Sequence, residues 1–81
     1  MGKEYKIKCK TPSAQKLQAV LQRLPSPLHN SPLSEIYNYM VEEDGFYFVD
    51  HLVDSKTASH AFRIFVDAAL ASNQIVEISE L

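Results

Sequence analysis

The chain has 81 residues, of which 46% are hydrophobic and 22% are charged, and its formal net charge is −2. This length and composition predict a single folded α+β domain that spans residues 1–81 and exclude a disordered tail. The small negative charge excludes bulk electrostatic attraction to nucleic acid or to an anionic membrane, and a single cysteine excludes an internal disulfide.

Membrane insertion is also not expected, because no segment approaches the run of about 18 apolar residues that a spanning helix needs. The first residues contain no apolar core of signal-peptide length. We therefore expect a cytoplasmic protein.

Residues 3–10 alternate between two kinds of side chain. Tyr5, Ile7 and Cys9 take one parity, and charged residues take the other (Glu4, Lys6, Lys8 and Lys10). A period of two predicts a strand with one face on the core and one charged face. Thr11 then predicts the N-cap of an amphipathic helix that ends near Leu24, because Pro25 disfavours helical geometry in the residue before it.

A proline-rich connection over residues 25–33 leads to the next two predicted strands, which lie within residues 34–53. Two runs of β-branched and aromatic residues flank the turn signal Glu43-Asp44-Gly45, and this pattern predicts a β-hairpin.

Two registers of this hairpin are possible, and they expose different faces. A two-residue loop at Asp44-Gly45 would pair Val41 with Phe48. A three-residue loop with a glycine bulge would instead pair Glu42 with Phe46. We favour the second register, because it gathers purely apolar side chains on one face and side chains with polar tips on the other (Tyr37, Tyr39, Tyr47 and His51).

Asp54 or Ser55 can cap a second helix that runs to about Ser72. Its polar residues fall on a single stripe and the remainder is largely apolar, which predicts a helix buried over most of its circumference (the stripe is Lys56, His60, Arg63 and Asp67). Asn73 is expected to end this helix in a left-handed conformation, and residues 74–79 are expected to form the last strand.

The predicted order is therefore strand, helix, strand, strand, helix, strand. Right-handed crossovers place both helices on one face of a four-stranded antiparallel sheet, which is the ferredoxin-like βαββαβ arrangement. The other sheet face stays open. In the favoured register it carries the residues that we predict to bind a partner: Tyr37, Tyr39, Tyr47 and His51, with Lys6 and Lys8 at the rim.

Residues 44–51, with the sequence DGFYFVDH, resemble the aromatic signature on the third strand of RNA-recognition motifs at Gly45, Phe46, Phe48 and Val49. The resemblance implies a single-stranded RNA-binding domain in which Phe46 and Phe48 face outward and stack on bases. Asp44 stands where that family has a basic residue, and with a negative net charge we do not expect a nucleic-acid partner.

Catalysis, a metal and a cofactor are not expected either. The spacing of His51, Asp54 and His60 matches no recurrent ligand pattern, and Cys9 is expected to face the core. The sequence instead predicts a non-catalytic protein-interaction module that self-associates, as a homodimer, through the open sheet face or an edge strand. The alternatives are the RNA-binding domain, an inhibitor-type protein and a small-molecule regulatory domain.

Overall fold

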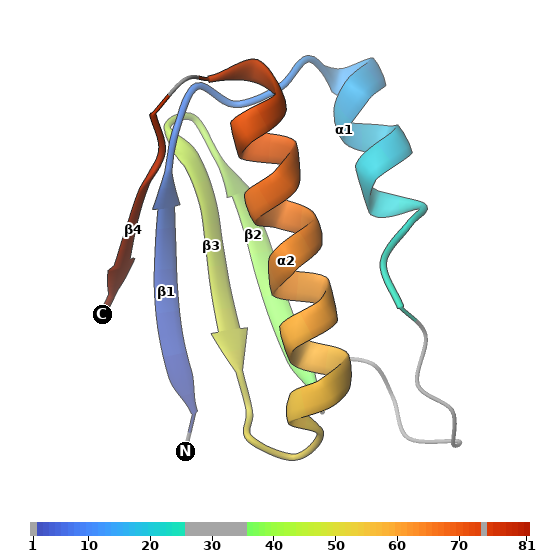
Figure 1. Ribbon diagram of the computed structural model, residues 1–81, viewed down its shortest axis with the longest axis vertical. Helices are drawn as coiled ribbons and strands as arrows, with labels where there is room; N and C mark the ends of the chain where they lie inside the picture. Colours follow the sequence, from blue (N-terminus) through green and yellow to red (C-terminus); the bar gives the residue numbers. More distant parts are fainter. Residues whose placement is uncertain (1, 26–35, 74) are drawn as a thin grey trace.

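The computed structural model describes residues 2–25, 36–73 and 75–81. Its elements follow the predicted order: β1 (Lys3–Lys8), α1 (Ala14–Leu21), β2 (Tyr37–Glu42), β3 (Gly45–Asp50), α2 (Ser55–Ser72) and β4 (Glu77–Glu80) (Figure 1). Most of the predicted proline-rich connection, residues 26–33, lies outside the described residues.

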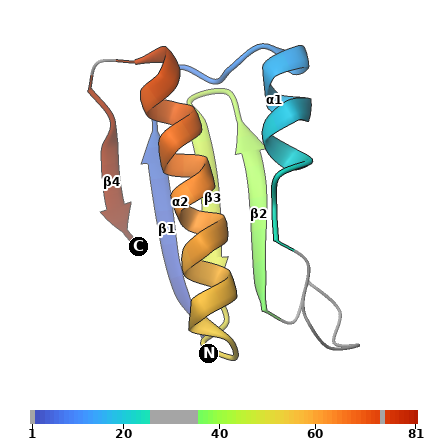
Figure 2. The same ribbon diagram turned by 45° about the vertical axis from the view of Figure 1, so that its right-hand side comes forward.

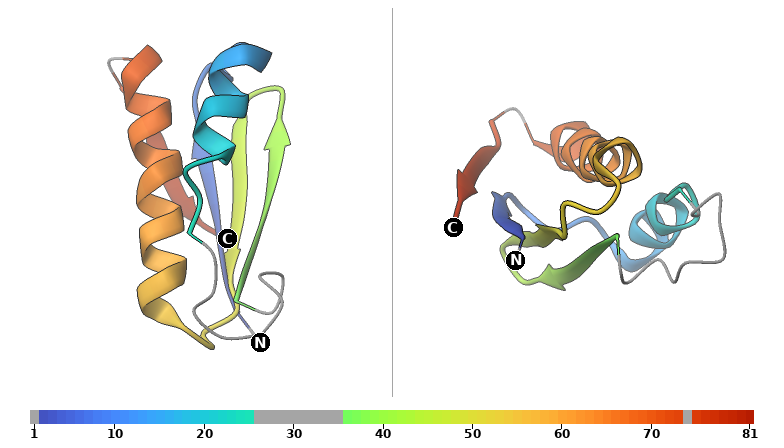
Figure 3. Two further views of the ribbon diagram at one scale, coloured as in Figure 1. Left: turned by 90° about the vertical axis from the view of Figure 1, so that its right-hand side faces the viewer. Right: turned by 90° about the horizontal axis from the view of Figure 1, so that it is seen from below.

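The four strands form one antiparallel sheet in the order β2-β3-β1-β4. Both helices lie on the same side of this sheet, with α2 across its middle and α1 toward β2 (Figure 3). The predicted α+β, ferredoxin-like fold is therefore confirmed. At the other edge, β4 stands away from both helices (Figure 2).

The core lies between α2 and the central strands β1 and β3. Phe65 of α2 is fully buried, and its ring centroid lies 5.1 Å from that of Phe46 and 6.0 Å from that of Phe48. Small residues at three buried positions of α2 allow the helix to approach the sheet closely (Ala58, Ala61 and Ala69). The predicted helix and its exposed polar stripe are confirmed.

The hairpin register differs from both predicted registers. Glu42 lies opposite Gly45, and Glu43-Asp44 form a two-residue turn. Tyr37 and Tyr39 consequently share the helix-covered face with Phe46 and Phe48, while Met40 lies opposite Tyr47 on the open face. The expectation that Tyr37 and Tyr39 face outward is therefore wrong.

Gly45 explains the register, because it belongs to β3 and not to the turn. Its φ of +131° favours glycine, and a Cβ atom there would lie 1.9 Å from the carbonyl oxygen of Ile7 on β1. The close approach of β1 therefore fixes where β3 begins. The sequence interpretation had used the same glycine for the turn itself.

Thr11 also has a role other than the predicted one. Its hydroxyl donates to the carbonyl oxygen of Glu42 at 2.5 Å and accepts from the N–H of Gly45 at 3.1 Å. With Thr11 holding the hairpin turn, Ser13 is the N-cap of α1, and its hydroxyl accepts from the N–H of Lys16 at 3.5 Å. The helix therefore begins two residues later than a Thr11 cap implies.

Asn73 ends α2 in an extended conformation, not the predicted left-handed one. Its amide nitrogen donates to the carbonyl oxygen of Ala69 at 2.8 Å, and its side-chain oxygen accepts from the N–H of Lys10 at 3.3 Å. These bonds tie the end of the helix to the segment after β1. The last strand accordingly begins at Glu77, later than predicted.

Candidate interaction surfaces

The structure divides the six predicted partner-binding residues between the two faces of the sheet. Lys6, Lys8, Tyr47 and His51 lie on or beside the open face. The other two, Tyr37 and Tyr39, lie on the face that the helices cover. The predicted tyrosine surface is thus not assembled.

Tyr37 is buried in the core, with 2% of its surface exposed. Its ring stacks on Phe48 with 5.4 Å between centroids, and its hydroxyl has no hydrogen-bond partner among the described residues. Burial, with a smaller effect of Tyr39, raises the pKa of Tyr37 to about 12. Tyr39 is 37% exposed at the margin of the core, with its ring 5.0 Å from that of Phe65.

On the open face, Lys6 forms ion pairs with two carboxylates of the hairpin. Lys6 Nζ lies 2.5 Å from Glu42 Oε1 and 2.7 Å from Asp44 Oδ1. Hydrogen bonds to Asp44 and then Glu42 raise the pKa of Lys6, and the bond to Lys6 lowers the pKa of Asp44. The Tyr47 hydroxyl donates to Glu4, which raises the pKa of Tyr47.

Apart from Leu81, which lies opposite Glu4 at the edge, this face exposes few apolar side chains. The side-chain amide nitrogen of Asn38 lies 2.7 Å from Nε2 of His51. Met40 is 59% exposed, and Val49 is half-buried between Glu4 and Asn38 of the neighbouring strands. A partner that covered the open face would have to desolvate its ion pairs for a small apolar gain.

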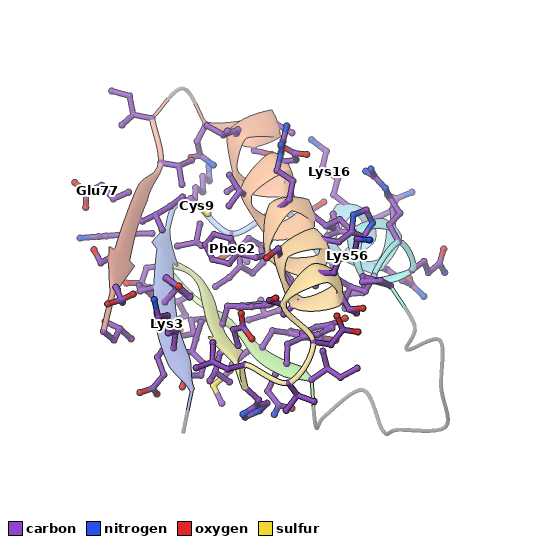
Figure 4. The ribbon with its side chains drawn as sticks, turned by 60° about the horizontal axis from the view of Figure 1, so that its bottom comes forward. Lys3, Cys9, Lys16, Lys56, Phe62 and Glu77 are labelled. Carbon is purple, nitrogen blue, oxygen red and sulfur yellow. The ribbon has the colours of Figure 1, made fainter. Side chains whose placement is uncertain are left out.

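Apolar side chains are also exposed along the sheet edge that β4 forms. They come from this last strand and from the residues on either side of it. Ile78 of β4 is 47% exposed, and Ile75 and Leu81 on either side of the strand are 84% and 68% exposed. Figure 4 shows Glu77 directed outward from β4, whereas Phe62 lies beneath α2, toward the sheet. We call Ile75, Ile78 and Leu81, together with the outer backbone of β4, the β4 edge.

One side of the β4 backbone is paired with β1, and no other described strand pairs with its outer side. The N–H of Leu81 donates to the carbonyl oxygen of Glu4 at 2.8 Å. Hydrogen-bonded and non-hydrogen-bonded pairs alternate in an antiparallel ladder, so Ser79 and Glu77 also turn their backbone groups toward β1. The N–H and C=O groups of Ile78 and of the residues two positions on either side therefore point away from the sheet.

Sequence reasoning identified the last strand but not the apolar residues of its edge. The predicted element order already contained a signal for these residues. In the βαββαβ order the last strand has one neighbour, so its apolar residues receive less cover than those of the central strands. Ile75, Ile78 and Leu81 could have been singled out on this basis.

The described part of the chain was predicted to hold neither a reactive thiol nor a metal site, and two observations bear on these groups. Cys9 is half-buried against the core, and burial raises the pKa of its thiol, which disfavours the reactive thiolate. Residues 2–25, 36–73 and 75–81 contain no cluster of three His, Cys, Asp or Glu residues that could hold a metal ion.

Two shallow hollows accompany these surfaces. One, of about 150 Å³, is lined by Tyr5, Phe48 and Phe62 beside Asp50 and Ser59, and the other, of about 300 Å³, lies between α1 and α2. Among the helices that the structure describes, none combines the length and apolar character that crossing a membrane requires.

The resemblance to RNA-recognition motifs implies outward-facing phenylalanines, and the structure has them inward. Phe46 and Phe48 are 0% and 1% exposed beneath α2, so neither can stack on a base. Comparison of the chain with protein-family models, with curated proteins and with solved structures finds no match.

Proposed function

We propose that the protein is a non-catalytic protein-interaction module that self-associates as a homodimer through the β4 edge. One observation carries this proposal: Ile78 combines an exposed apolar side chain with backbone N–H and C=O groups that point away from the sheet. An added strand can satisfy those backbone groups and cover the side chain at the same time. We further propose a cytoplasmic location, which the single free thiol of Cys9 supports.

The β4 edge supports this function better than the open face does. On the open face, Lys6 already has two carboxylate partners, and Tyr47 already donates to Glu4. At the β4 edge the exposed groups include apolar side chains and the outer backbone of the strand. The strand is also short and carries Glu77 and Glu80, features that discourage indiscriminate edge pairing. A partner strand must therefore match it in sequence.

A proline at position 78 tests the proposal, because the Ile78 N–H takes no part in the β1–β4 ladder. Ile78→Pro removes an outward donor and the apolar side chain, and edge strands tolerate proline at such a position. Ile78→Val is the matched control, since it keeps the N–H and a β-branched side chain. We expect wild type and Ile78→Val to show a monomer–dimer equilibrium in sedimentation experiments, and Ile78→Pro to remain monomeric.

Circular dichroism and thermal unfolding should confirm that all three proteins are folded. A wild-type protein that sediments as a monomer up to hundreds of micromolar would refute self-association. Dimerisation of the folded Ile78→Pro variant with wild-type affinity would remove the β4 edge from the proposal.

A further inference from the structure

We infer that two copies of the chain pair their β4 strands antiparallel in one register, with a two-fold axis passing between their Ile78 residues. The inference rests on the proposed function and specifies the partner strand and its alignment. It follows from three properties of the β4 edge: the direction of its free backbone groups, the face on which each side chain lies, and the order of its apolar and acidic residues.

Symmetry limits the registers that two β4 strands can adopt. A two-fold axis perpendicular to the sheet keeps the helices of both copies on the same side. Residues that lie opposite each other must then share a face. Because side chains alternate along a strand, allowed registers differ by a two-residue shift of one strand against the other, which moves the two-fold axis by one residue. Only a few alignments of a strand as short as Glu77–Glu80 remain.

The register centred on Ile78 sets the exposed apolar residues opposite one another. Ile78 lies opposite the partner's Ile78, and each exchanges its free N–H and C=O with the other as a hydrogen-bonded pair. Continued along the flanks of β4, this register sets Ile75 opposite the partner's Leu81, so that two strongly exposed apolar side chains cover each other on the sheet face opposite to Ile78. Glu77 lies opposite the partner's Ser79, and Val76 lies opposite the partner's Glu80.

The two neighbouring registers set glutamates opposite unsuitable residues of the partner strand. A shift of the axis by one residue toward the N-terminus sets Glu77 directly opposite the partner's Glu77, and like charges in that position are destabilising. A shift in the other direction sets Ile78 opposite the partner's Glu80 and Glu77 opposite the partner's Leu81. Either shift also separates Ile75 from Leu81. Of these three registers, only the one centred on Ile78 both avoids Glu77 opposite Glu77 and sets Ile75 opposite Leu81.

Surroundings within each copy favour the same arrangement. Glu77 lies opposite Lys8 of its own β1 on the open face. On the helix side, Phe62 packs on Tyr5 of β1 with 5.0 Å between ring centroids. Leu70, near the end of α2, is 49% exposed. β4 itself stands away from both helices (Figure 2), so the outer side of the strand is accessible to a second copy.

Single-cysteine variants in a Cys9→Ser background test the register directly. A hydrogen-bonded antiparallel pair has its Cα atoms about 5.5 Å apart, which suits a disulfide. Ile78→Cys should therefore form a disulfide-linked dimer rapidly when diamide is added. Ser79→Cys residues would be diagonal neighbours, about 7–8 Å apart, and should link at least tenfold more slowly, which makes this variant the matched control.

Amide hydrogen exchange gives a second readout that needs no substitution. The Ile78 and Glu80 amides, which face away from β1, should exchange quickly at low protein concentration and become protected as the dimer forms. The Ser79 amide, which bonds to β1, should be protected at both concentrations.

The outcomes separate the register from the function. Faster linking of Ser79→Cys than of Ile78→Cys, with wild type dimeric, would refute the register and leave self-association through β4 intact. A dimer in which neither variant links and the Ile78 amide stays unprotected would place the interface elsewhere. A monomer in sedimentation would refute the proposed function, and the register with it.

Discussion

The two faces of the sheet are made by the same strands and differ in what their side chains contact. On the helix-covered face, aromatic rings from the hairpin pack against Phe62 and Phe65 of α2. On the open face, Lys6 joins carboxylates of the hairpin, and Tyr47 donates to Glu4. The covered face holds the fold together by burial, whereas the open face is a polar surface on which Lys6 and Tyr47 already have partners within the chain. The difference teaches that an uncovered sheet face need not be the binding surface.

The largest expected effect comes from the residue that fixes which side chains reach each face. Gly45→Ala would force a Cβ atom to within 1.9 Å of the Ile7 carbonyl oxygen, at a φ of +131°. We expect a loss of more than about 4 kcal/mol in the free energy of unfolding, measured by urea denaturation. Glu43→Ala, in the exposed turn beside it, is the control and should change little. A stable Gly45→Ala protein would contradict this account of the register.

Alanine substitutions at two adjacent residues of β3, one on each face, compare the two faces most directly. Phe48 is 1% exposed on the covered face, and Phe48→Ala should cost about 3–5 kcal/mol. Tyr47→Ala, on the open face, should cost only a small part of that, because it leaves no cavity in the core. Denaturation midpoints of the two variants provide the measurement. Equal losses would mean that the open face also carries buried packing.

Tyr37 is an exception on the covered face, because its hydroxyl is buried without a hydrogen-bond partner among the described residues. Tyr37→Phe should raise the free energy of unfolding by about 1 kcal/mol, because it removes an unsatisfied buried group. Tyr39→Phe, at a partly exposed position, is the matched control and should leave stability unchanged.

The same substitution should alter the response to alkali. The pKa of Tyr37 is raised from 10.0 to about 12 in the folded protein. Between these two pKa values the tyrosine ionises more readily in the unfolded chain than in the folded protein. The free energy of unfolding is therefore unaffected by this ionisation below pH 10 and falls as the pH rises to about 12. Tyr37→Phe should show a smaller decline across that interval in thermal melts. An identical decline in both proteins would contradict the raised pKa.

The smallest effect is expected on the open face, where solvent screens the ion pairs. Lys6 lowers the pKa of Asp44, so this carboxylate stabilises the fold above its ordinary pKa of 3.8 and loses that contribution as the pH falls through its lowered value. Asp44→Asn should slightly lower stability at neutral pH and flatten the decline below about pH 4. Glu43→Gln, which has no ion pair among the described residues, is the control. Equal acid sensitivity in wild type and Asp44→Asn would count against the pair.

Much of the fold could be predicted from local patterns. Alternation over β1 and the apolar circumference of α2 gave the element order, and α2 runs from Ser55 to Ser72 with Asp54 as its cap, as expected. The candidate site was predicted less well. Tyr37 and Tyr39 suit either face, because a tyrosine ring is apolar enough for the core and its hydroxyl suits a surface. Their placement could not be decided from the hairpin sequence alone.

The sequence by itself determined the strands, the helices and their order, because hydrophobic periodicity and capping residues act over a few neighbouring positions. Only the tertiary structure decided the hairpin register and which apolar side chains stay exposed at the β4 edge. Gly45 meets the Ile7 carbonyl, and Thr11 bonds to Glu42. Both contacts join segments that are distant in the chain, and they select one of several registers that the local sequence would permit.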